Sequence, residues 1–125
     1  MVGAHAVLGF ICMGALLVLG FHARGKVRSG RPYEGAPYLI GVILIDLQVL
    51  LGIGLWVQGE WWLADGFLQP WLHPILSLGA FAAVHVGIRR ANNERWAAQA
   101  YGIAGRAMFL PLILLLAVVG ISEAA

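Results

Sequence analysis

The chain has 125 residues, of which 61% are hydrophobic and 11% are charged, with a formal net charge of +2 at pH 7. Soluble domains average roughly 45–50% apolar and about 25% charged residues. This length leaves room for a single domain over residues 1–125, and this composition indicates that lipid rather than water surrounds most of it.

The apolar residues form four blocks of membrane-spanning length. Ala4–Ala23 contains no Lys, Arg, Asp or Glu, and Asp46 is the only charge in the second block. Each block is close to the ~20 residues that a ~30 Å hydrocarbon core requires, provided that the last is extended back past Arg106, whose guanidinium then snorkels toward the headgroups. The sequence therefore predicts an all-α, integral membrane, up-down-up-down four-helix bundle, with helices over about 4–23, 38–58, 71–89 and 98–122.

The basic residues predict the orientation, because all eight lie in or beside two of the three connections. They are Arg24, Lys26, Arg28 and Arg31 in the first connection, and Arg89, Arg90, Arg95 and Arg106 in or beside the third. The positive-inside rule then places loops 24–37 and 89–106 in the cytoplasm, and loop 58–70 and both termini outside (N-out/C-out). We therefore expect a multi-pass protein of the cell inner (cytoplasmic) membrane.

The same charges require no nucleic-acid partner, since anionic lipid headgroups account for a basic cytoplasmic face. No Lys or Arg precedes the first apolar block, so we expect an uncleaved helix rather than a signal peptide. The second connection is flanked and filled by tryptophans, which are typical of a membrane interface. The expected partners are the lipid bilayer and either further membrane subunits or other copies of this chain.

Histidines carry the most specific functional signal. His5 and His22 lie in the first helix and His73 and His85 in the third, whereas the second and fourth helices have none. In an up-down-up-down bundle the first and third helices are parallel and usually diagonal, so their inward side chains face each other. His5 with His73, and His22 with His85, would form two pairs that could hold the axial positions of one or two haem b irons.

The spacing of these histidines argues against two ideal pairs. His5 and His22 are 17 residues apart, whereas His73 and His85 are 12 apart. At 1.5 Å per residue the two separations differ by ~7 Å. Twelve residues also rotate His85 by about 120° from His73, toward a different neighbouring helix.

Asp46 is a further ionisable residue inside a predicted span, where burying a charge costs free energy. A carboxylate there can orient a histidine, hold a quinone oxygen or pass a proton, and His85 and Arg106 are the candidate partners. A neutral Asp46 bonded to a neighbouring helix is the structural alternative. No phosphate-binding glycine loop, zinc-type Cys/His spacing, HExxH or CxxCH is present, and whether the chain is an enzyme stays open.

Two segments carry a resemblance to a known family. The segment 48–59, QVLLGIGLWVQG, and the segment 72–85, LHPILSLGAFAAVH, resemble a helix pair from one four-helix half of haem A synthase and, more loosely, small b-type cytochromes of respiratory membranes. The similarity covers about a third of the chain. It implies a four-helix b-haem bundle with a histidine of the His-Pro helix as an axial ligand. The synthase helix with a glutamate and a histidine has no counterpart, so synthase activity is not implied.

The leading hypothesis is a b-type haem-binding membrane protein that transfers electrons in a respiratory or related chain, with quinone as a further candidate cofactor. The histidines clustered on two parallel helices favour it. One alternative is a cofactor-free accessory or assembly subunit of a larger membrane complex, which the unequal histidine spacings favour. Another is a small proton-coupled transporter that uses Asp46 and His85.

Overall fold

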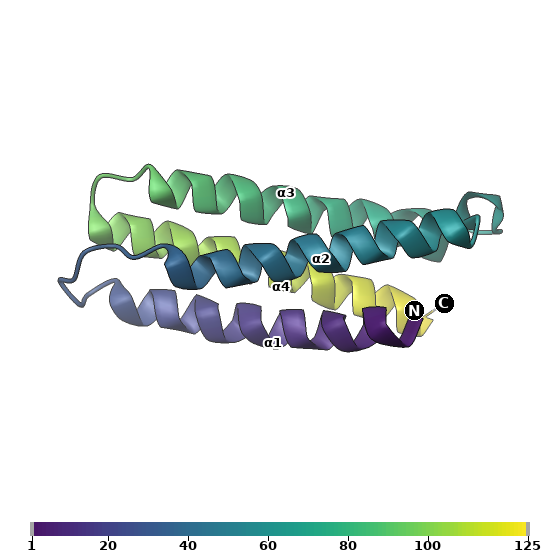
Figure 1. Cartoon of the computed structure of the whole chain (residues 1–125), viewed down its shortest axis with the longest axis horizontal. Coiled ribbons are helices and arrows are strands. Elements are labelled where there is room, and N and C mark those ends of the chain that lie inside the picture. The colour runs from purple at the N-terminus through teal and green to yellow at the C-terminus, as the bar shows by residue number, and fades with distance from the viewer. Residues whose placement is uncertain (1, 125) are drawn as a thin grey trace.

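The computed structural model describes residues 2–124, with side chains described over residues 3–121, and contains four long helices. In chain order these are α1 (Val2–Lys26), α2 (Ala36–Gln58), α3 (His73–Asn92) and α4 (Ala97–Ala124). Two short turns, η1 (Trp61–Leu63) and η2 (Leu68–Leu72), connect α2 to α3 (Figure 1). All four spans are long and apolar enough to cross a membrane, which confirms the predicted fold class.

The expected helices are all present, and their ends differ from expectation by a few residues. The fourth begins at Ala97, one residue before its expected start, and Arg106 is exposed on its surface. At the start of the third, a π-helical turn over Leu68–Leu72 precedes an α-helix that begins at His73. Met1 and Ala125, which are expected on the outside of the membrane, are not among the described residues.

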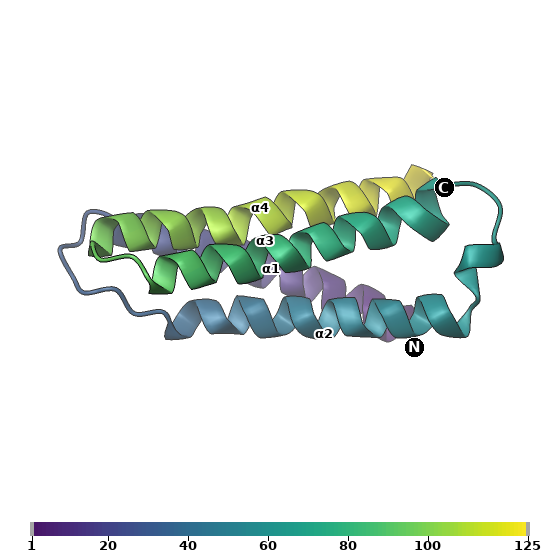
Figure 2. The same cartoon turned by 90° about the horizontal axis from the view of Figure 1, so that it is seen from above.

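The helices run alternately up and down, so α1 and α3 are parallel and lie diagonally, with α2 and α4 on opposite sides between them (Figures 1 and 2). We call the end that holds η1, η2 and the start of α1 the tryptophan end. The opposite end, where α1 and α3 finish in Arg24 and Arg89–Arg90, is the arginine end. The predicted diagonal relation of the two histidine-bearing helices is therefore present.

Small residues set how closely the helices pack. A Cβ atom added to Gly87 of α3 would lie 2.5 Å from Cβ of Ala107, and one added to Gly20 of α1 would lie 2.6 Å from the ring of Phe109. Both neighbours belong to α4, whose interfaces with α3 and α1 are the most extensive in the bundle. Because packing rather than hydrophobicity drives helix association in lipid, α4 is the helix on which α1 and α3 assemble.

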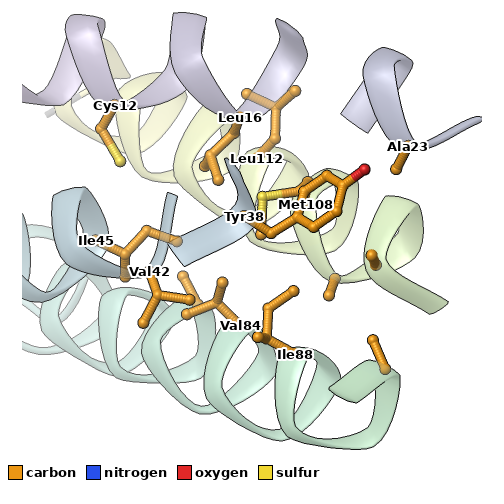
Figure 3. Close-up of a cluster of buried hydrophobic side chains, with 14 of the residues drawn as sticks. Cys12, Leu16, Ala23, Tyr38, Val42, Ile45, Val84, Ile88, Met108 and Leu112 are labelled. Atoms are coloured by element: carbon orange, nitrogen blue, oxygen red, sulfur yellow. The ribbon is translucent and has the colours of Figure 1, made fainter. Parts of the chain in front are cut away.

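The middle of the bundle is apolar. Ile45 of α2, Val84 of α3 and Met108 of α4 are almost completely buried, together with Cys12 and Leu16 of α1 (Figure 3). No polar or charged residue is fully buried among the described side chains. Asp46 and His85 directly follow Ile45 and Val84 in the chain, so this pair lies level with the apolar layer, but its side chains are partly exposed.

Tyrosines fasten the first connection to the rest of the arginine end. The hydroxyl of Tyr101 in α4 donates to the Pro32 carbonyl at 2.9 Å and accepts from the Glu34 amide at 3.1 Å. The hydroxyl of Tyr33 donates to Oδ1 of Asn92 at 3.1 Å. Burial and the neighbouring Tyr101 raise the pKa of Tyr33, which keeps its phenol protonated and able to donate. A loop rich in glycine and proline is thereby held in one conformation.

The packing of α3 on α4 predicts different effects of alanine at two glycines of α3. Gly87→Ala should lower the free energy of unfolding by about 1–3 kcal/mol, because the new methyl group overlaps Ala107. Gly79→Ala is the matched control, since its Cβ would meet Leu114 at an ordinary 3.7 Å. Denaturant unfolding in detergent micelles compares the two variants. Equal free energies of unfolding would show that the contact between Gly87 and Ala107 is not close enough to exclude a methyl group.

Candidate functional site

A cavity of about 310 Å³ lies at the tryptophan end. All four helices contribute to its lining, and His5 of α1 and His73 of α3 both face it. We call it the tryptophan-end cavity. It is the place where the diagonal arrangement of α1 and α3 brings two of the four predicted histidines together.

The two imidazoles of this cavity are neighbours. Their ring centroids lie 6.3 Å apart, and the ring planes are inclined by 40°. Both side chains are partly buried, and Nδ1 of His5 is enclosed without a hydrogen-bond partner among the described residues. An enclosed ring nitrogen without a partner is costly in an apolar setting, which makes it a candidate ligand atom.

The turn before α3 places His73. Pro70 is buried in the π-helical turn, and its carbonyl accepts a hydrogen bond from Nε1 of Trp56 in α2 at 2.6 Å. One turn later, Oγ of Ser77 donates to the His73 carbonyl at 2.9 Å. π-Helical turns inside longer helices occur frequently at functional sites, because the extra residue redirects the side chains that follow.

Glycines make the space in which the polar side chains of the cavity lie. A Cβ added to Gly52 would lie 3.0 Å from Cε1 of His5, and one added to Gly9 would lie 2.9 Å from Nε2 of Gln48. Oε1 of Gln48 is enclosed and has no hydrogen-bond partner among the described groups. The cavity thus holds two unsatisfied polar atoms, on His5 and Gln48, in a predominantly apolar lining.

Tryptophans cover this end of the bundle. The ring of Trp56 lies 5.2 Å from that of Trp62 and 5.5 Å from that of Trp71, between centroids. Trp61 lines the cavity itself. The interfacial role expected for these residues is therefore combined with closing the cavity on the side of the second connection.

The arginine end does not bring His22 and His85 together. Nδ1 of His22 lies 3.0 Å from the hydroxyl of Tyr38 in α2, and Nε2 of His85 lies 2.6 Å from Oδ1 of Asp46. The rotation of His85 away from His73 along α3 accounts for this, since it turns His85 toward α2. Of the two partners considered for Asp46, His85 is the one that bonds it.

The pair formed by Asp46 and His85 borders a second, larger hollow of about 630 Å³ between α2 and α3. The two side chains are 33% and 42% exposed, although both belong to membrane-spanning helices. The hollow continues past Arg89 to Asn92 at the end of α3. We call it the arginine-end groove.

Two features of these sites were not anticipated from the sequence. They are the partnership of His22 with Tyr38 and the π-helical turn before His73. Across the described residues no group of three or more His, Cys, Asp or Glu side chains is gathered as for a protein-ligated metal ion.

Comparison with protein-family profiles, with curated proteins and with solved structures found no match to this chain.

The hydrogen bond from Trp56 to the Pro70 carbonyl predicts a loss of stability when it is removed. Trp56→Phe should lower the free energy of unfolding by about 1 kcal/mol, since the indole donor is lost while an aromatic ring stays. Trp62→Phe is the control, because no hydrogen bond involves its ring within the described structure. Thermal unfolding in detergent, followed by near-UV circular dichroism, measures both, and equal midpoints would contradict the assigned bond.

Proposed function

We propose that this chain is a b-type haem-binding membrane protein that transfers electrons, with one haem held between His5 and His73. The observation that carries the proposal is the approach of two imidazoles from diagonal helices at the tryptophan-end cavity. The histidine distribution in the sequence and the resemblance to one half of haem A synthase support the same function. The resemblance to haem A synthase is itself part of this proposal, whereas synthase activity is not proposed.

His5 and His73 would each supply one imidazole nitrogen to the haem. Their ring centroids lie 6.3 Å apart across the cavity. A pair of histidines is sufficient for a six-coordinate haem, because the macrocycle supplies the other four ligands.

The chain's own residues would hold and tune the group as follows. His5 and His73 would supply the axial nitrogens, and Gly52 leaves room for the ring of His5. The π-helical turn and its bond to Trp56 fix where His73 begins α3. A bound haem supplies one-electron transfer, and the apolar lining and tryptophan cover of the cavity would limit its exposure to water.

One haem is proposed rather than two, because His22 and His85 bond other partners. Tyr38 engages His22 between α1 and α2, and Asp46 engages His85 between α2 and α3. Neither imidazole has a second histidine opposite it among the described ring contacts.

We further propose that the arginine end faces the cytoplasm and that the membrane is the inner membrane. The positive-inside rule supports this orientation, because the basic residues lie at that end and the second connection carries Glu60 and Asp65. The proposed haem then lies in the outer leaflet.

Replacement of the proposed ligands should remove the haem. The purified wild-type protein should show sharp reduced-minus-oxidised α and Soret bands with one haem per chain, and His73→Ala or His5→Ala should lower the haem content at least about tenfold. His22→Gln and His85→Gln are the matched controls and should retain it. Haem is quantified as its pyridine complex.

A featureless spectrum from haem-replete cells would refute the proposal and favour the cofactor-free accessory subunit. Full haem content in His73→Ala would exclude that residue as a ligand. Each variant is first checked for the helical circular dichroism and the elution volume of the wild type, so that loss of haem is separated from loss of the fold.

The proposed orientation is tested by labelling single cysteines in a Cys12→Ser background. Ala64→Cys, in the second connection, should react with a membrane-impermeant maleimide in intact cells. Ser29→Cys, in the first connection, should react only after permeabilisation. The reverse labelling pattern would show that the orientation is opposite to the proposed one.

A further inference from the structure

The arginine-end groove combines three features that are typical of a ligand-binding site. Asp46 and His85 are bonded at 2.6 Å, lie within membrane-spanning helices and stay exposed by a third or more of their side chains. An ionisable pair open to hydrocarbon is costly, so a polar group must meet it in the membrane. From these residues we infer that the groove binds the head group of a lipid-soluble quinone.

The walls of the groove suit a flat ring with polar edges. The buried Val42 and Ile88 form an apolar floor beside the Asp46–His85 pair. The ring of Phe81 lies 4.4 Å from that of His85, inclined by 44°, and is 37% exposed. Phe81 does not itself line the groove, and it packs against the imidazole of His85 beside it.

The polar atoms suit the carbonyl oxygens of a quinone. In the tautomer that carries its proton on Nδ1, His85 can donate from that nitrogen to a ligand oxygen while Nε2 faces Asp46. Arg89 lies one helical turn further along α3, on the same groove, and has no ion-pair partner among the described residues. Two donors at different depths match two carbonyls on opposite sides of a ring.

The groove begins at the arginine end and reaches Asp46 and His85 within the span. Ile45 and Val84, which directly precede the pair in the chain, face the bundle interior and are almost completely buried (Figure 3). Gln48, the next polar residue of α2, faces the tryptophan-end cavity instead. The open side of the groove gives the pair access to the arginine end, from which a quinone that takes up one proton at each carbonyl on two-electron reduction can be supplied.

Quinone binding is independent of the haem, whereas electron exchange between the two rests on the proposed function. The test is therefore a binding measurement with the whole chain in phosphatidylcholine nanodiscs, using decylubiquinone and menaquinone-2 as probes. Saturable binding of either probe is expected, weakened at least about tenfold in Asp46→Asn and in His85→Gln, because each loses a charge-assisted hydrogen bond. His22→Gln, which alters a histidine at the same end but outside the groove, should bind as the wild type does.

A second measurement locates the ligand without a substitution. A photoreactive azido-ubiquinone should label peptides within residues 39–46 and 81–93, and excess decylubiquinone should prevent the labelling. Labelling spread over all four helices, or equal affinity in Asp46→Asn, His85→Gln and the wild type, would overturn the inference.

Two further readouts separate this inference from the proposed function and from a protein partner. Haem content should be unchanged in Asp46→Asn and His85→Gln, so quinone binding without haem would refute the proposed function alone. If Ile43→Cys cross-links two chains in nanodiscs and no saturable quinone binding is found, the groove is covered by a second copy and the inference fails.

Discussion

The absence of water in the hydrocarbon core is the constraint from which the structure follows. Each backbone amide must be satisfied within its own helix, so four uninterrupted spans are the available solution for this chain. Between such helices the hydrophobic effect contributes little, and close contact must hold them together. Gly20, Gly87 and Ala107 supply that contact at the surfaces of α4.

The division of polar groups between the two ends has a physical meaning. At the tryptophan end, His5 and Gln48 hold unsatisfied atoms inside a cavity. At the arginine end, Asp46 and His85 satisfy each other at the surface of the bundle. Polar atoms without a partner are thus enclosed inside the bundle, whereas the ionisable pair is bonded where the bundle is open.

Hydropathy alone was sufficient to predict the helices and their alternating directions, because lipid demands long apolar spans. The diagonal relation of α1 and α3 also followed, and it brought His5 near His73. The partners at the arginine end depended on helix rotation: the 120° turn between His73 and His85 indicated a different neighbour but did not identify it. The bond of His22 to Tyr38 and the π-helical turn depend on contacts between distant segments, which no local pattern encodes.

The tyrosine contacts of the first connection have a consequence for biogenesis. The loop between α1 and α2 is hydrogen-bonded to Tyr101 of α4 and to Asn92 at the end of α3. These helices leave the ribosome after the loop that they fasten. The first hairpin must therefore enter the membrane with its connection still loose, and it reaches its final geometry only when the last helix docks. Membrane insertion and completion of the fold are separate events in this protein, and the second waits for α4.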